Sequence, residues 1–308
     1  MEAAEEKRFI QAEENVLNIA PLRFYKVLGA LMHKDRIEEI HFRVGRPVQV
    51  IGSRTDMLLT QYEDFSAHEA KIMLESCCGH SVYARENELR EGFISLPGGS
   101  RVGICGNPVY IDGRIARFMN VSSFNFRIAR EVRGCAEKFM HLFVSKGRPV
   151  SVLVSSRPGV GKTTLLRDCA RCLSDGIGVS RPFKVAIADE RNEISGSFDG
   201  APVLDVGMRT DVMAGIPKSA AMPMLIRSMA PEVIITDELS GAQEAQSISE
   251  AVKRGVAVIA SVHAGSAAEL RQKTHIVNAV RGGLFKRVLL LERNGTHFSA
   301  AQIDLQEM

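Results

Sequence analysis

Residues 150–164 read VSVLVSSRPGVGKTT, and an apolar helical run from Leu165 to Leu173 follows them. A buried strand, a glycine-containing loop and a helix thus occur in the order that a phosphate-binding loop requires. Glycines allow backbone N–H groups to turn toward phosphate oxygens, and the start of the helix contributes its positive end. We therefore expect this loop to bind nucleotide phosphates. The expected binding residues are Pro158, Gly159, Val160, Gly161, Lys162, Thr163 and Thr164.

Two side chains of the loop have specific expected roles. Lys162 should reach the β and γ phosphates of ATP, and the Thr163 hydroxyl should bind Mg²⁺. Ser156 occupies the position of the first glycine in the usual pattern G-x-x-x-x-G-K-[ST]. Because serine resists positive φ, we expect the first turn of the loop to be slightly rearranged.

Short continuous apolar runs alternate with helical stretches from residue 150 onward. Such runs indicate strands buried on both faces, and hence a parallel sheet covered by helices. The runs are Val150 to Val154, Lys184 to Ala188, Val233 to Thr236, Val256 to Val262 and Arg287 to Leu291. This part of the chain is therefore predicted to have an α/β fold.

The run from Val233 to Thr236 ends in Asp237 and Glu238. A carboxylate at the C-terminal end of a parallel strand points into the crevice where such sheets bind ligands. We expect Asp237 to hold Mg²⁺ and Glu238 to polarise the attacking water. Two acids also commonly end a strand that simply leaves the core, but the upstream phosphate loop favours the functional interpretation.

An additional strand, Lys184 to Ala188, lies along the chain between these two motifs and ends in Asp189-Glu190-Arg191-Asn192-Glu193. That strand, together with Glu238 beside Asp237, indicates the additional-strand, catalytic-glutamate class of P-loop NTPases. The sequence contains no Asn-Lys-x-Asp motif for guanine recognition. Glu190 or Glu193 can position water or Mg²⁺; a solvated charge run at a strand end is the alternative.

A histidine ends the strand predicted from Val256 to Val262. His263 would face the same crevice, where it can donate a hydrogen bond to the γ phosphate or to a water. An isolated histidine more often has a structural role, but its alignment with the other motifs favours catalysis.

The first part of the chain is predicted to be a smaller α+β domain. Apolar residues between Phe9 and Met32 have helical spacing that Pro21 interrupts, which predicts two short helices. Two hairpins follow, one around Gly45-Arg46-Pro47 and one around Pro97-Gly98-Gly99. We expect an accessory or oligomerisation domain over 1–140 and an ATPase domain over 141–308.

Composition excludes several classes of protein. The 308 residues include 39 basic and 36 acidic ones, a net charge of +3, so we expect no nucleic-acid partner. No apolar stretch reaches the roughly 18 residues of a membrane-spanning helix, and the N-terminus is acidic, which predicts a cytoplasmic protein. Cys169 and Cys172 have CxxC spacing, but they lie in a predicted helix without further ligands, which favours buried thiols over a zinc site.

Several motifs together resemble known families. Lys162, Asp237-Glu238 and the segment Ser261–Ala264 resemble the RecA-like domain of type II and type IV secretion ATPases. Further segments resemble the stage III sporulation protein AA family, and their combination is specific. These segments are Leu89–Ile94, Leu96–Gly99, Arg127–Glu131, Asp189–Arg191, Gly215–Lys218 and Met222–Pro231.

The resemblance implies an ATPase that uses ATP and Mg²⁺ and forms a homo-oligomer, a hexameric ring. It implies a location in the mother cell of endospore formers, at the outer forespore membrane, where the protein powers or assembles a secretion-like channel to the forespore. The implied partners are membrane proteins of the same operon, the AB protein in particular. It also implies an arginine that acts on a neighbouring subunit's nucleotide, for which Arg209, Arg127 and Arg130 are candidates.

Two other functions remain open from the sequence. One is a nucleotide-binding scaffold that assembles on ATP with little turnover. The other is a nucleic-acid translocase, against which the near-neutral charge and the lack of a basic stripe interleaved with aromatics argue.

Overall fold

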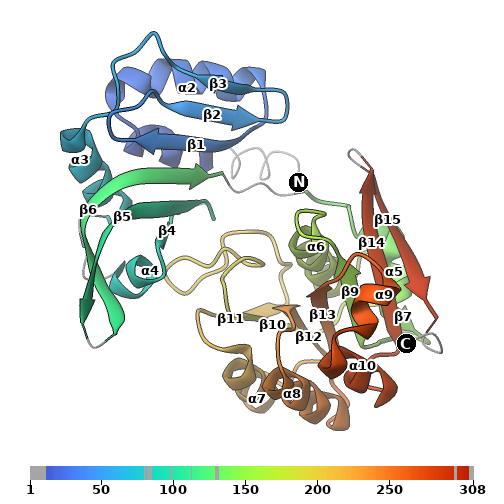
Figure 1. Cartoon of the computed structure of the whole chain (residues 1–308). Coiled ribbons are helices and arrows are strands. Elements are labelled where there is room, and N and C mark those ends of the chain that lie inside the picture. The colour runs from blue at the N-terminus through green and yellow to red at the C-terminus, as the bar shows by residue number, and fades with distance from the viewer. Residues whose placement is uncertain are drawn as a thin grey trace. The chain divides into compact units, whose positions relative to one another are not determined.

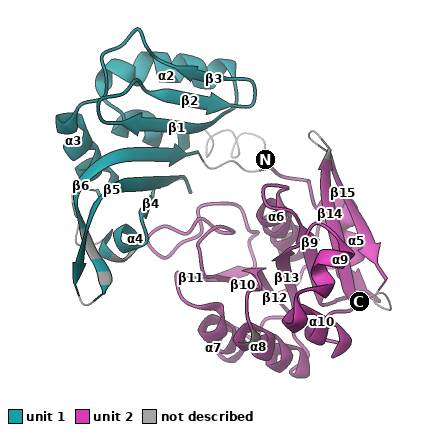
Figure 2. Cartoon of the chain, viewed as in Figure 1, with its two compact units in different colours: residues 1–130 teal, residues 131–308 magenta. Residues whose placement is uncertain are grey.

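The computed structural model describes residues 12–79, 81, 85–97, 99–111, 113–128, 132–294 and 297–304. It divides the chain into two compact units, residues 1–130 and 131–308 (Figure 2). The division falls ten residues before the expected boundary at 140. The reason is that Ala136, Phe139 and Met140 pack into the hydrophobic core of the second unit.

The first unit is built on an antiparallel sheet of six strands, in the order β3-β2-β1-β6-β5-β4 (Figure 1). Its core combines aliphatic side chains with a group of phenylalanines, in which the Phe42 ring packs against Phe65 at 5.2 Å and against Phe126 at 5.6 Å. A helical segment over residues 12–19 precedes the named elements. These are α2 (Leu22–Lys34), β1 (Ile37–Arg43), β2 (Gln49–Gly52), β3 (Asp56–Leu58), α3 (Ala67–Cys77), α4 (Glu86–Arg90), β4 (Phe93–Ser95), β5 (Arg101–Ile111) and β6 (Arg114–Arg127).

The α+β prediction for this unit is confirmed. Pro21 separates the two N-terminal helices, as expected, and the hairpins correspond to the pairs β1–β2 and β4–β5. The sequence did not predict β6, which pairs with both β1 and β5. Register shifts along the β5–β6 ladder, one of them between Cys105 and Gly106, disturb the regular alternation that identifies a strand.

The second unit contains a seven-stranded sheet in the order β11-β10-β12-β13-β9-β14-β15. Its elements begin with the short η2 (Glu137–Phe139), α5 (Met140–Phe143), β7 (Val144–Ser145) and β8 (Arg148–Pro149). The sheet and its helices follow as β9 (Val152–Ser156), α6 (Lys162–Asp175), β10 (Val185–Asp189), β11 (Thr210–Ala214), α7 (Lys218–Ser228), β12 (Val233–Glu238), α8 (Ala242–Lys253), β13 (Ala257–His263), α9 (Ala267–Arg271), α10 (Thr274–Arg281), β14 (Arg287–Asn294) and β15 (His297–Ile303).

Helices cover both faces of this sheet (Figure 1). Residues such as Val154 and Ile235 pack toward α6 on one face. Leu153 and Ile234, next to them in the same strands, pack on the other face with residues of α7, α8 and α10. The strands are therefore buried on both sides, which confirms the α/β prediction.

Two details of the predicted sheet need correction. First, the strand that lies between β9 and β12 in the sheet is β13, whereas β10 lies beyond β12. The additional strand of this NTPase class is thus the one that ends in His263, and order along the chain did not reveal order in the sheet. Second, β15 is antiparallel to β14, so the sheet is mixed. A connection this short can only join antiparallel strands.

The CxxC pair lies in α6, where Cys169 and Cys172 are fully buried in the core, as the sequence predicted. Within the part of the chain that the structure describes, no helix is long and apolar enough to cross a membrane.

Candidate nucleotide-binding site

Parallel strands bring the predicted site residues to one edge of the second unit's sheet. His263 at the end of β13 lies opposite Ser156 at the end of β9. On the other side of β13, Ser261 lies opposite Glu238 at the end of β12. The phosphate loop, His263 and the acidic pair Asp237-Glu238 therefore occupy three adjacent strand ends, where open α/β sheets bind ligands.

The backbone of the phosphate loop depends on glycine at two positions. Gly159 has φ of 76° and Gly161 has φ of 109°, both in the left-handed region. A Cβ atom at Gly161 would also lie only 2.8 Å from the ring of Phe298, a residue of β15. Ser156 is not among the described residues with positive φ, because it still belongs to β9. The expected rearrangement at the start of the loop is therefore not needed.

Lys162 begins α6, and its ammonium group is held by protein acceptors. Its three N–H groups are shared among acceptors that include the Ser156 carbonyl at 3.1 Å, the Ser156 hydroxyl at 3.1 Å and the Arg157 carbonyl at 3.3 Å. It also lies 2.8 Å from Nδ1 of His263. Burial lowers the pKa of Lys162 to about 8, against the opposing effect of the Glu238 charge. The serine that replaces the first glycine thus provides an acceptor for this lysine.

His263 connects Lys162 to Glu238. Its Nδ1 atom lies 2.8 Å from the Lys162 ammonium, and its Nε2 atom lies 3.2 Å from Oε2 of Glu238, a contact that lies off hydrogen-bond geometry. Burial and then the charge of Lys162 lower the pKa of His263, while Glu238 opposes them. His263 therefore contacts both Lys162 and Glu238, and its surroundings favour the neutral ring.

Asp237 is only 5 % exposed, and Oδ1 makes an ion pair with Lys218 Nζ at 2.7 Å that lies off hydrogen-bond geometry. Among the described residues, Oδ2 has no hydrogen-bond partner. Burial raises the pKa of Asp237, and Lys218 opposes this shift. An unsatisfied carboxylate oxygen is a fitting ligand for Mg²⁺. The half-buried Thr163, in the first turn of α6, can supply the second protein ligand.

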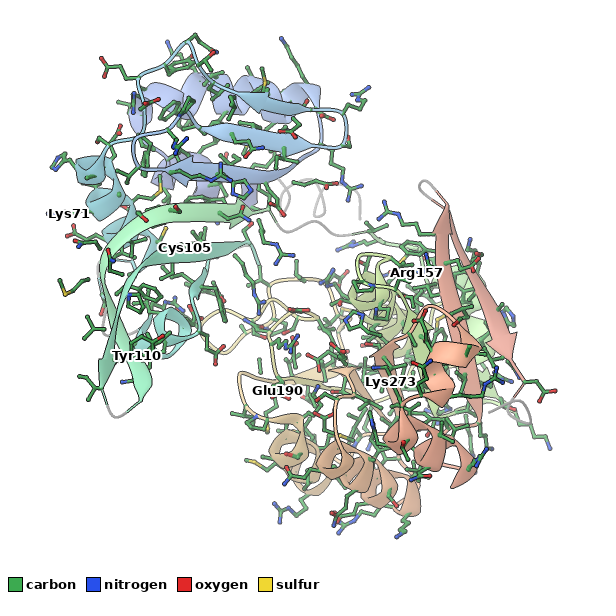
Figure 3. The ribbon with its side chains drawn as sticks, in the orientation of Figure 1. Lys71, Cys105, Tyr110, Arg157, Glu190 and Lys273 are labelled. Carbon is green, nitrogen blue, oxygen red and sulfur yellow. The ribbon has the colours of Figure 1, made fainter. Side chains whose placement is uncertain are left out.

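Glu190, labelled in Figure 3, follows the end of β10 and interacts with Lys218. Its Oε2 atom accepts from the Lys218 backbone N–H at 3.3 Å and lies 3.6 Å from the Lys218 ammonium. Glu193 is half-buried, and its charge acts on Asp237. Glu190 thus contacts Lys218, and Glu193 acts on Asp237 through its charge; their roles toward water or Mg²⁺ stay predictions.

Two residues at this edge were not predicted to matter. Asp189 is fully buried and accepts hydrogen bonds from the Ser195 backbone N–H at 2.8 Å and hydroxyl at 2.6 Å, which folds the segment after β10. Lys218 is the other. The signal that could have revealed it is a lysine just after Pro217, because a cation at a helix start opposes the helix dipole and needs acidic partners.

The candidate arginines lie in different parts of the chain, and within the second unit Arg209 is not brought to the site. Arg209 donates to the Ser174 carbonyl at 3.1 Å, near the end of α6. Since α6 has 14 residues, about 20 Å of helix separates that end from the phosphate loop. Arg127 belongs to the first unit, where it lies 4.0 Å from Glu39. Arg130 falls outside the described residues.

The strand order and the helices on both faces define a RecA-like α/β fold of the P-loop type. Solved structures share the fold: the ATPase DotB of Legionella pneumophila has a TM-score of 0.57 at 14 % identity, covering 86 % of this chain and 76 % of its own. The pilus retraction motor PilT, solved with bound ADP, has a TM-score of 0.55 at 13 % identity, covering 88 % of this chain and 79 % of its own.

The sequence model of the family described as sporulation stage III, protein AA matches residues 10–303, so the chain belongs to this family. The Stage III sporulation protein AA of Bacillus subtilis (strain 168) is 36 % identical over 257 residues, which cover 83 % of each chain. The protein SEEDLING PLASTID DEVELOPMENT 1 of Arabidopsis thaliana is 36 % identical over 149 residues, 48 % of this chain and 21 % of that protein. The expected family is thereby confirmed.

Proposed function

We propose that this protein hydrolyses ATP at the edge formed by β9, β13 and β12. The observation that carries the proposal is the line of contacts Lys162, His263 and Glu238, which joins the phosphate loop to a carboxylate beside the partly unsatisfied Asp237. A site that only bound nucleotide would need Lys162 but not a glutamate oriented by a histidine. The arrangement therefore favours hydrolysis over binding alone.

The same contacts suggest how the residues act. Lys162 is bound to the carbonyls of its own loop and lies against His263. The triphosphate would offer this ammonium stronger, charged acceptors, so Lys162 would exchange protein oxygens for phosphate oxygens. His263 would continue to orient Glu238, which would accept a proton from the attacking water. When bound to Asp237 and Thr163, Mg²⁺ would neutralise charge on the phosphates.

The proposed cellular role rests on the family and on the fold. As an oligomeric ATPase, a hexameric ring, the protein would power or assemble a secretion-like channel between mother cell and forespore. It would do so as a cytoplasmic protein at the outer forespore membrane, held there by membrane proteins of its operon such as the AB protein. The first unit would contribute to oligomerisation. Arg209, Arg127 or Arg130 would reach the nucleotide of a neighbouring subunit; Arg209, near the far end of α6, does not lie at its own site.

Phosphate release from ATP by the full chain tests the proposal. Glu238→Gln keeps the size of the side chain but removes the base, so hydrolysis should fall by about 10²- to 10⁴-fold while a fluorescent ATP analogue still binds. Glu250→Gln, a substitution at an exposed position of α8, is the matched control and should behave as wild type.

Two results would support the other functions. A wild-type chain that binds ATP tightly and assembles, but does not turn over with or without the cytosolic part of its membrane partner, would indicate a scaffold. Hydrolysis that depends on added single-stranded DNA would indicate a nucleic-acid translocase.

A further inference from the structure

Lys218 is a buried cation at the start of helix α7, and the dipole of this helix does not stabilise its charge. It is the first residue of α7, after Pro217, and is 5 % exposed. At this position the positive end of the helix dipole repels a positive charge. Burial of an ammonium group without compensation is also unfavourable. Its position must therefore be held by groups from other elements.

Those groups are carboxylates at the edge that carries the nucleotide site. The Lys218 ammonium lies 2.7 Å from Asp237 Oδ1, 3.6 Å from Glu190 Oε2 and 3.8 Å from Glu244 Oε1. It also donates to the backbone carbonyl of Glu238. These acceptors come from the end of β12, the segment after β10 and the first turn of α8. One ammonium is thus shared among acidic side chains from three elements.

Oxygen atoms of this type are also the ligands that a divalent cation prefers. Among the described residues, no group of three or more His, Cys, Asp or Glu side chains is arranged to hold a metal by itself. The ammonium lies at the point where the acidic side chains converge. Meanwhile Asp237 keeps one buried oxygen, Oδ2, without a hydrogen-bond partner in the described part of the chain. The Oδ1 atom of Asp237 is therefore paired with the Lys218 charge, and the Oδ2 atom is available to a metal ion.

We propose, on the basis of the proposed ATPase function, that Lys218 is a built-in counter-cation of these carboxylates. It orients Asp237 and excludes divalent cations while the site lacks nucleotide, so that the metal binds only together with nucleotide phosphates. Lys218 is thus a positioning residue, which acts on the metal ligand and not on the phosphates. Exclusion follows from charge, since the ammonium repels a divalent cation placed within a few ångströms of it.

Binding of Mn²⁺ to the nucleotide-free full chain, followed by electron paramagnetic resonance, tests the proposal without requiring hydrolysis. Wild type should bind Mn²⁺ weakly at this site, and ADP should strengthen the binding. Lys218→Met removes the charge and keeps most of the apolar side chain, so Mn²⁺ should bind roughly tenfold or more tightly without nucleotide. Lys218→Arg keeps the charge and should resemble wild type. Lys253→Met, at an exposed position of α8, is the control.

Equal nucleotide-free Mn²⁺ affinity in wild type and folded Lys218→Met would overturn the proposal. Should Lys218→Met fail to fold, as circular dichroism would show, the wild type decides: nucleotide-free Mn²⁺ binding as tight as binding with ADP contradicts it, and a clear strengthening by ADP supports it. A wild-type chain that shows the expected Mn²⁺ behaviour but hydrolyses no ATP would refute only the ATPase function.

Discussion

Lys162 and Lys218 lie at the same edge of one sheet and are buried almost equally, at 6 % and 5 % exposed, but their surroundings differ. Lys162 is bound mainly by neutral acceptors, namely loop carbonyls, a hydroxyl and the His263 ring. Lys218 is surrounded by acidic side chains. Since charged acceptors bind an ammonium more strongly than neutral ones, the proposed function requires Lys162 to exchange its partners for phosphate and Lys218 to stay in place.

The largest expected effect follows from removing the exchangeable lysine. Lys162→Ala should weaken ATP binding by at least about 100-fold, because it removes the cation that follows the β and γ phosphates. The variant should still fold, because burial disfavours the Lys162 charge and its removal should not destabilise the protein. Titration with a fluorescent ATP analogue measures the affinity, with Lys184→Ala at an exposed position as the control. An unchanged affinity of Lys162→Ala for the ATP analogue would show that Lys162 does not exchange its protein acceptors for phosphate, and would contradict the proposed difference between Lys162 and Lys218.

Removal of the histidine should separate binding from turnover. His263→Ala leaves Lys162 its loop acceptors, so ATP affinity should change by less than about threefold, while hydrolysis falls by roughly 10- to 100-fold because Glu238 loses its orienting partner. The exposed His141→Ala is the control. A lower melting temperature with unchanged activity per folded molecule would instead identify His263 as a structural residue.

The pKa of Lys162 predicts how ATP affinity depends on pH. Its pKa of about 8 in the free protein means that the ammonium is present at pH 7 and is lost as the pH rises. Above pH 8 the affinity for ATP should therefore fall, by up to about tenfold per pH unit, because binding then requires Lys162 to take up a proton from the solvent. Calorimetric titrations from pH 6.5 to pH 9.5 measure it. An affinity that is constant over this range would mean that the lysine is not held by neutral acceptors.

The smallest expected effect concerns the glycine that shapes the loop. Both Gly161→Ala and Gly255→Ala place a side chain at positive φ, which costs about 1–2 kcal/mol. Only at Gly161 does the new Cβ meet a neighbour, Phe298, so this variant should lose about 1 kcal/mol more. Urea unfolding of both variants gives the difference. Equal losses would show that Phe298 does not confine the loop.

Much of the second unit, residues 131–308, could be predicted from the sequence, because its buried segments are recognisable from their apolar residues. Strands covered on both faces contain continuous apolar runs, such as Val233–Ile235 in β12, and the phosphate loop has a fixed spacing. The strands β11 and β15 were missed, since both lie at the edges of the sheet and are only partly apolar. Phe298 could not be connected with Gly161 for the same reason.

The site residues that lie at the end of a strand could be predicted from the sequence. The residue whose role depends on contacts with several other elements was missed. Asp237, Glu238 and His263 each end a recognisable strand, so their convergence follows from parallel pairing. Lys218 lies at a helix start, and its role depends on acidic residues from three other segments. Such a convergence has no fixed spacing along the chain, so the lysine after Pro217 could indicate a cation that needs acidic partners, but only the structure shows which partners it has.

The account depends most on His263 and Glu238 acting as one unit, and a double-mutant cycle on the rate of ATP hydrolysis tests this directly. His263→Ala, Glu238→Gln and the double variant would be compared with wild type in single-turnover experiments with saturating protein and radiolabelled ATP. If His263 acts by orienting Glu238, the double variant should be no slower than Glu238→Gln alone. Rate losses that multiply in the double variant would show that the two residues act independently and would contradict the account.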